Sequence, residues 1–109
     1  MQIERVNELL LEELAQAVNR EINLPDAMIT ISFVECEPDL KTARVGFSVL
    51  PDRLAGTAMR LLKSSTPQLV GGVKKRVKLR KLPHLNWEFD ATEREAEIIE
   101  KLIDDSNKY

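Results

Sequence analysis

Residues 63–83 read KSSTPQLVGGVKKRVKLRKLP, and the rest of the chain is organised around this stretch. It begins with a polar break in an otherwise helical pattern and continues as a basic segment. Thr66 is typical of a helix N-cap, and Pro67 is typical of a first helical residue, where its missing N–H costs nothing. The stretch therefore predicts two helices separated by a kink at Ser65–Pro67.

Charge is sorted around the same stretch. Residues 1–52 carry ten acids and four bases, residues 53–83 carry nine bases and no acid, and residues 84–109 carry eight acids and three bases. The three blocks have net charges of −6, +9 and −5, which give the −2 of the whole chain. A polyanion would relieve the repulsion within the basic block by neutralising it and releasing counterions. The pattern therefore favours binding to a phosphate backbone.

The composition indicates one globular domain, residues 1–109, with an ordinary charged fraction of 31%. No apolar run approaches the roughly 20 residues of a membrane span, and the acidic first helix is not typical of a signal peptide. The single cysteine, Cys36, and the single histidine, His84, cannot make an internal disulfide or a metal site of usual ligand count. We expect a cytoplasmic monomer without a cofactor.

The N-terminal part has the period of a helix. Apolar residues recur at steps of three and four from Ile3 to Val18, which predicts an amphipathic helix packed on the core over about residues 2–21. Leu24-Pro25 ends it, because proline disfavours helical geometry in the residue before it.

Two strands follow, around residues 29–36 and 43–49, joined by a turn at residues 37–41. The apolar alternation of the first strand changes phase after Ile31, which predicts a β-bulge near Ser32–Phe33. Cys36 in this strand is interpreted as a small buried hydrophobe rather than a reactive thiol.

The last third of the chain predicts a strand and a helix. Leu85, Trp87 and Phe89 alternate as a third strand, and their shared face favours core packing over a base-stacking platform. Thr92 with Glu95 forms a capping box for a short final helix. Upstream, Gly71-Gly72 weakens its helix by roughly 1 kcal/mol per glycine relative to alanine. Close packing against another element is the structural explanation, and close approach of a ligand to the backbone is the functional one.

The sequence offers no catalytic constellation. His84 has no spaced partner, and the Val70–Val73 segment lacks the lysine and serine of a phosphate-binding loop. The carboxylates fall on the outer sides of helices, which is typical of a solvated surface. We expect that the protein is not an enzyme.

An ordered series of residues runs over nearly the whole chain. Its members are Glu4-Arg5-Val6, Leu10, Leu14, Arg20-Glu21-Ile22, Val34-Glu35, Pro38-Asp39-Leu40-Lys41, Ala43, Val45, Lys78-Leu79-Arg80, Pro83, Leu85, Phe89 and Asp90. This series resembles the bacterial ribosome-binding factor A family. The resemblance implies an α+β, type II KH-like domain of order α-β-β-α-α-β, with a kinked helix pair, a three-stranded sheet and a short C-terminal helix.

The resemblance also implies a function. Members of the family bind the small ribosomal subunit during its late maturation, near the 5′ region of its RNA; they are linked to growth in the cold and are not enzymes. Their two middle helices meet at an Ala-x-Gly kink. In this chain that position holds Ser65-Thr66-Pro67, so serine and proline replace the alanine and the glycine.

The basic block and the kink predict one RNA-binding surface. Its candidate residues are Lys63, Ser65, Thr66, Lys74, Lys75, Arg76, Lys78, Arg80 and Lys81, extended by Arg53 and Arg60. The alternatives are a solvated basic face, a general single-strand nucleic-acid-binding KH-like module, and a protein-interaction module that binds an acidic partner. If the RNA does not bind here, the face bearing Arg44 and Arg53 is the next candidate.

Overall fold

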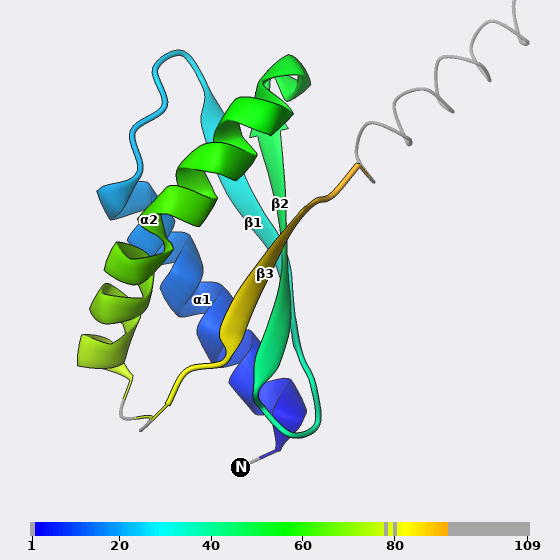
Figure 1. Cartoon of the computed structure of the whole chain (residues 1–109), viewed down its shortest axis with the longest axis vertical. Coiled ribbons are helices and arrows are strands. Elements are labelled where there is room, and N and C mark those ends of the chain that lie inside the picture. The colour runs from blue at the N-terminus through cyan, green and yellow to red at the C-terminus, as the bar shows by residue number, and fades with distance from the viewer. Residues whose placement is uncertain (1, 78, 80, 92–109) are drawn as a thin grey trace, which may run out of the picture.

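The computed structural model describes residues 2–77, 79 and 81–91. Its elements are α1 (Ile3–Glu21), β1 (Met28–Cys36), β2 (Thr42–Leu50), the short 3-10 helix η1 (Asp52–Leu54), α2 (Ala55–Arg76) and β3 (His84–Phe89) (Figure 1). The predicted α+β class and first helix are confirmed. The helix predicted after Thr92 lies outside the described residues. Within the described part of the chain, no helix is both long and apolar enough to cross a membrane.

The sheet has the order β1-β2-β3, in which β1 pairs antiparallel and β3 pairs parallel with the central β2. The hairpin register steps from Ile31↔Phe47 to Phe33↔Gly46, so the predicted bulge at Ser32 is confirmed. It keeps apolar residues on one face on both sides of the step. The predicted turn is also present, since the Leu40 N–H donates to the Glu37 carbonyl over 2.8 Å.

Both helices lie on one face of this sheet, where α1 packs over β1 and α2 packs over β3 (Figure 1). The centre of the core is Phe47 of β2, which is fully buried and lies with its ring centroid 5.8 Å from that of Phe89. Leu85 and Trp87 are buried in the same core, so the predicted core packing of the third strand is confirmed. Cys36 is likewise buried, and burial raises the pKa of its thiol.

The predicted separation of two helices at Ser65–Pro67 is wrong. Pro67 lies inside α2, whose axis changes direction about midway along its length (Figure 1). Proline in a helix interior removes one hydrogen bond and clashes with the carbonyl four residues back, so it bends the helix. Leu62 and Leu69, before and after the bend, are fully buried in the same core, which holds both halves of α2 over one sheet. The kink survives as a bend within one helix.

Thr66 is not an N-cap. Its hydroxyl donates to the Leu62 carbonyl over 2.8 Å, a back-bond that bends helices, and accepts a bond from Trp87 Nε1 over 2.9 Å. The same hydroxyl therefore connects the bend of α2 to β3. This contact spans 21 residues of sequence, and it explains why local helix-start signals misplaced Pro67.

The predicted close packing at Gly71-Gly72 is wrong for Gly71. A Cβ at Gly71 would meet nothing within 4 Å, whereas a Cβ at Gly72 would lie 3.8 Å from Arg20 Nη2. Neither glycine is required by a tight contact inside the protein. The functional explanation, close approach of a ligand to the backbone, stays a prediction.

Candidate RNA-binding surface

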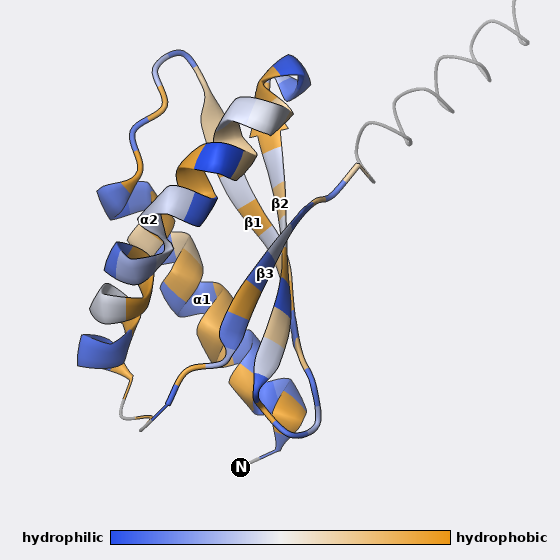
Figure 2. Ribbon diagram, in the orientation of Figure 1, coloured by the Kyte–Doolittle hydropathy of each residue, from blue (hydrophilic) through white to orange (hydrophobic). Residues whose placement is uncertain are grey.

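Four of the five predicted cations in α2 share one side of the helix. Arg60, Lys63, Lys74 and Lys75 are exposed. With 3.6 residues per turn, they fall on the side opposite the buried Leu62, Leu69 and Val73. We call these four residues the α2 outward face. Hydrophilic residues recur along α2 (Figure 2), and Arg60 and Lys75 lie about 22 Å apart along a helix of 1.5 Å rise.

The remaining predicted residues are placed around this face. Arg53 in η1, Arg76 at the end of α2 and Lys81 beyond it are exposed, whereas Ser65 and Thr66 at the bend are half-buried. Arg76 Nη1 donates to Gln16 Oε1 of α1 over 3.1 Å. Lys78 and Arg80 lie outside the described residues. Most of the predicted cations thus lie along α2. Thr66 differs from them, because its hydroxyl is already hydrogen-bonded to Leu62 and Trp87 within the protein.

Part of this charge has a structural explanation. Lys74, Lys75 and Arg76 form the last turn of α2, where cations interact favourably with the helix dipole. Arg60 and Lys63 lie in the helix interior, where that effect has decayed. The ion pairs recorded among the described residues all involve Arg44 and none involves α2. The α2 outward face therefore presents cations that are not neutralised by those ion pairs.

Arg44 lies in a different environment, on the side of the sheet opposite the helices, which we call the outer sheet face. Its guanidinium donates two hydrogen bonds to Glu88, of 3.0 and 2.5 Å, and one of 2.9 Å to Glu35. It also lies 5.4 Å from the centroid of the Phe33 ring. The hydrogen bond and charge of Glu88 raise the pKa of Arg44, and the hydrogen bond from Arg44 lowers the pKa of Glu88. Two carboxylates thus neutralise this cation.

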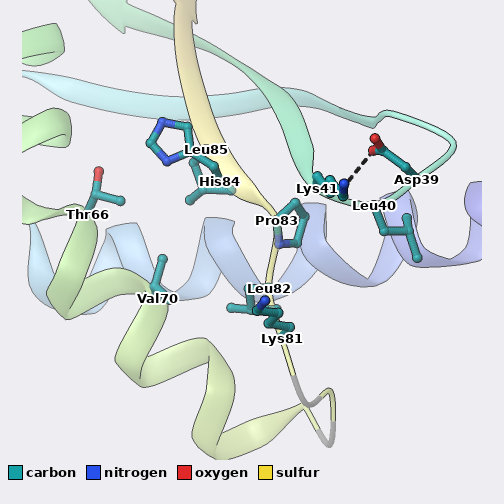
Figure 3. A pocket seen from close by; sticks show the side chains of 10 residues that line it. All are labelled: Asp39, Leu40, Lys41, Thr66, Val70, Lys81, Leu82, Pro83, His84 and Leu85. Atoms are coloured by element: carbon teal, nitrogen blue, oxygen red, sulfur yellow. Dashed lines mark hydrogen bonds between the residues drawn. The ribbon is translucent and has the colours of Figure 1, made fainter.

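A groove of about 870 Å³ lies beside the bend of α2 (Figure 3). It is bounded by the hairpin turn, by α2, and by the segment that leads into β3. Its lining residues are Asp39, Leu40, Lys41, Thr66, Val70, Lys81, Leu82, Pro83, His84 and Leu85. Thr66 and Lys81 are the predicted site residues among them. The groove combines apolar side chains with two lysines, Lys41 and Lys81, and one carboxylate, Asp39. Apolar side chains with a few polar groups are typical of ligand-binding grooves.

Comparison with known proteins decides the family. A family model described as ribosome-binding factor A matches residues 2–103. The chain belongs to the ribosome-binding factor A family. Its relative from Lachnoclostridium phytofermentans is 36% identical over 106 residues, covering 94% of this chain and 78% of the relative. The relative from Staphylococcus epidermidis is 30% identical over 107 residues, covering 96% and 92%.

Solved structures of the family share the fold. The crystal structure of ribosome-binding factor A from Thermus thermophilus matches with a TM-score of 0.72 at 22% identity, over 81% of this chain and 96% of that one. A homology model of the Thermus thermophilus factor, fitted into a cryo-EM map of a 30S complex, matches with a TM-score of 0.69 at 23% identity, over 78% and 91%. The KH-like architecture expected from the resemblance is confirmed.

The position of the bend in α2 agrees with the resemblance to the ribosome-binding factor A family. It falls where the resemblance placed the Ala-x-Gly kink, although this chain has Ser65-Thr66-Pro67 there. The bend does not use glycine. Proline removes the helical hydrogen bond, and the Thr66 hydroxyl bonds to Leu62 and Trp87 on either side.

Sequence reasoning missed two groove residues, Lys41 and His84. Lys41 belongs to the hairpin turn, and His84 begins β3; their backbones are joined by a 2.8 Å bond from the His84 N–H to the Lys41 carbonyl. The signal for Lys41 was present, because it lies in the Pro38–Lys41 series that carries the family resemblance. Its position opposite α2 follows only from the parallel pairing of β2 with β3.

Proposed function

We propose that this protein is a non-catalytic assembly factor that binds the small ribosomal subunit through its RNA during late maturation. The observation that carries the proposal is the α2 outward face in a chain of the ribosome-binding factor A family. Its cations are exposed, and residues 53–83 contain no acid to neutralise them locally. The Thermus thermophilus relative fitted into a 30S complex supports the same partner.

The proposed contact surface comprises the cations of α2 and its flanks together with the bend. Its residues are Arg53, Arg60, Lys63, Ser65, Thr66, Lys74, Lys75, Arg76, Lys78, Arg80 and Lys81. Cations spaced this densely act mainly as neutralisers of phosphates, because they cannot all reach base edges. The groove beside Thr66 extends the surface toward Lys41. The protein would act as a cytoplasmic monomer of one domain, and it would support processing of ribosomal RNA and growth in the cold.

Sedimentation of cell extract tests the partner. The factor should travel with free small subunits and be absent from complete ribosomes and polysomes. Distribution over messenger RNA would favour a general single-strand-binding module instead. Nuclease treatment before sedimentation separates a third possibility, because a complex with an acidic protein would survive digestion of the RNA.

A triple variant tests the surface. Replacing Lys74, Lys75 and Lys78 with glutamine should weaken binding to small-subunit RNA and lower the salt slope of binding by about two units, since each phosphate contact contributes roughly 0.7 to 0.9. Circular dichroism and thermal melting of the variant establish that it is folded. A folded variant with unchanged affinity and slope would remove the C-terminal end of α2 and Lys78 from the proposal. Cells lacking the factor should accumulate small-subunit RNA precursors and grow slowly in the cold.

A further inference from the structure

The last turn of α1 brings another cation beside α2. Arg20 is exposed, and its Nη2 lies 3.8 Å from the position that a Cβ at Gly72 would occupy. One turn earlier on α1, Gln16 accepts the 3.1 Å hydrogen bond from Arg76. The two helices pack against each other. Arg20 therefore lies at the edge of the C-terminal half of α2, although it belongs to the acidic block of the sequence.

The glycine pair leaves room at this edge. Lys75 lies four residues after Gly71 and three after Gly72, so all three are neighbours on the helix surface. Gly71 faces open space, whereas the Arg20 guanidinium lies beside Gly72. Gly71 and Gly72 thus form a stretch of α2 without side chains, which adjoins Lys75 on the helix surface and the Arg20 guanidinium at Gly72. A long side chain at position 72 would occupy the space that the guanidinium uses.

The charge of Arg20 is available to a partner. Within the described residues, no hydrogen bond or ion pair of its side chain is recorded, in contrast to the three bonds that hold Arg44. The carboxylates on its own helix that are nearest in sequence are Glu21 and Glu13, and neither forms a recorded ion pair with it. A cation next to a bare helical turn can meet a phosphate whose backbone approaches closely.

We propose that Arg20 is part of the RNA-binding surface, where it contacts a phosphate of the same RNA that α2 binds. The inference rests on the proposed function and extends its surface from α2 onto α1. Gly72 is the positioning residue: a Cβ alone would make only ordinary contact with Arg20 Nη2, at 3.8 Å, but a longer side chain there would compete with the guanidinium for space.

Single-charge variants of the full chain test the contact by a salt titration of binding to purified small-subunit RNA. Arg20→Gln should lower the salt slope by about 0.7 to 0.9 units. The matched control is Arg5→Gln, which removes the same charge from an exposed position at the other end of α1, about 22 Å away at 1.5 Å per residue. The control should keep the slope of the unmodified protein. Circular dichroism establishes that both variants are folded.

A second variant tests the positioning role of Gly72. Gly72→Gln should displace the guanidinium and lower the slope as Arg20→Gln does, and the double variant should lose no more than either single variant. If the glutamine merely blocks the RNA, its effect will persist in the Arg20→Gln background, and Gly72 is not the positioning residue.

The outcomes separate this inference from the proposed function. Arg20 is excluded if Arg20→Gln keeps the unmodified slope while the Lys74, Lys75 and Lys78 variant lowers it. The inference is also overturned if Arg5→Gln and Arg20→Gln lower the slope equally, because net charge then explains both. If the triple variant too keeps its slope, the proposed surface on α2 fails first.

Discussion

The α2 outward face and the outer sheet face both carry basic side chains, yet their surroundings differ. On α2 the cations follow one another along a helix within a segment of sequence that has no acid. On the outer sheet face Arg44 meets Glu35 from β1 and Glu88 from β3, and it covers the ring of Phe33. The charge of the α2 outward face is therefore available to a partner, whereas the charge of Arg44 is neutralised within the protein.

This difference argues against RNA binding on the alternative face at Arg44. The outer sheet face is not a strong candidate, because a phosphate approaching Arg44 would have to compete with two carboxylates already bonded to it. The ion-pair cluster instead links all three strands across one side of the sheet. Gly46 contributes to the same cluster, because the ring of Phe33 lies where a Cβ of residue 46 would be.

Among the tests of this comparison, the largest effect is expected when two cations are removed from the α2 outward face and matched by two removed elsewhere. Arg60→Gln with Lys63→Gln should lower the salt slope of RNA binding by roughly 1.4 to 1.8 units, because two phosphate contacts are lost. The control, Arg44→Gln with Arg5→Gln, removes equal charge from the outer sheet face and from the N-terminal end of α1, and it should leave the slope unchanged. Equal losses in the two double variants would show that net charge, and not position, governs binding. Both are measured well below their melting temperatures.

The next effect concerns stability at the bend, where α2 both packs on the core and carries candidate RNA-binding residues. Thr66→Val keeps the shape of the side chain but removes the acceptor of Trp87 Nε1 and the bond to Leu62. It should lower the free energy of unfolding by about 1 to 3 kcal/mol, since a partly buried donor is left unsatisfied. Denaturant unfolding measures this loss.

Two controls accompany the Thr66 variant. Thr66→Ser keeps the hydroxyl and should retain most of the stability. Ser64→Ala removes an exposed hydroxyl bonded to the Leu61 carbonyl, and it should change stability by no more than about 0.5 kcal/mol. If Thr66→Val is as stable as the unmodified protein, the hydroxyl does not hold the bend to β3.

Local sequence patterns predicted much of this fold because the deciding signals are local. The helical period of α1, the phase change at Ser32 and the alternation in β3 each lie within one element, and each is confirmed. Pro67 was misplaced because its helix is held by Trp87 and by burial of Leu62 and Leu69, which only the folded chain brings together.

The candidate site was predictable to a smaller extent. Counting charges by blocks of sequence found the cations of α2, but it placed Arg20 with the acids of the N-terminal block. The sequence offered Arg44 for an alternative RNA-binding face without revealing that carboxylates from two other strands neutralise it. Side chains far apart in sequence meet by packing, so charge patterns alone cannot tell a neutralised cation from one that is available.

A smaller effect on stability is expected at Gly71 of α2, and it is a gain instead of a loss. Gly71→Ala should raise the free energy of unfolding by about 1 kcal/mol, because alanine favours the helix and its Cβ meets nothing within 4 Å. Thermal melting measures the gain. A variant that is more stable but binds RNA more weakly would show that glycine is retained at this position for contact with a partner. A loss of stability would contradict the open environment of Gly71.

The smallest effect is expected on the outer sheet face and depends on pH. The hydrogen bond from Arg44 lowers the pKa of Glu88 in the folded protein, so its ionised form stabilises the fold above the ordinary glutamate pKa of about 4.3, and this contribution disappears as the pH falls through the lowered value. Glu88→Gln should therefore melt slightly below the unmodified protein at neutral pH, and the difference should shrink under acid. Added salt should shrink it as well, because the ion pair of Arg44 and Glu88 is exposed.

Glu35→Gln, which removes one hydrogen bond of Arg44 instead of two, should lower the melting temperature less than Glu88→Gln does. RNA binding by both variants at neutral pH should not weaken, and a lower salt slope in either one would mean that the outer sheet face also meets the RNA.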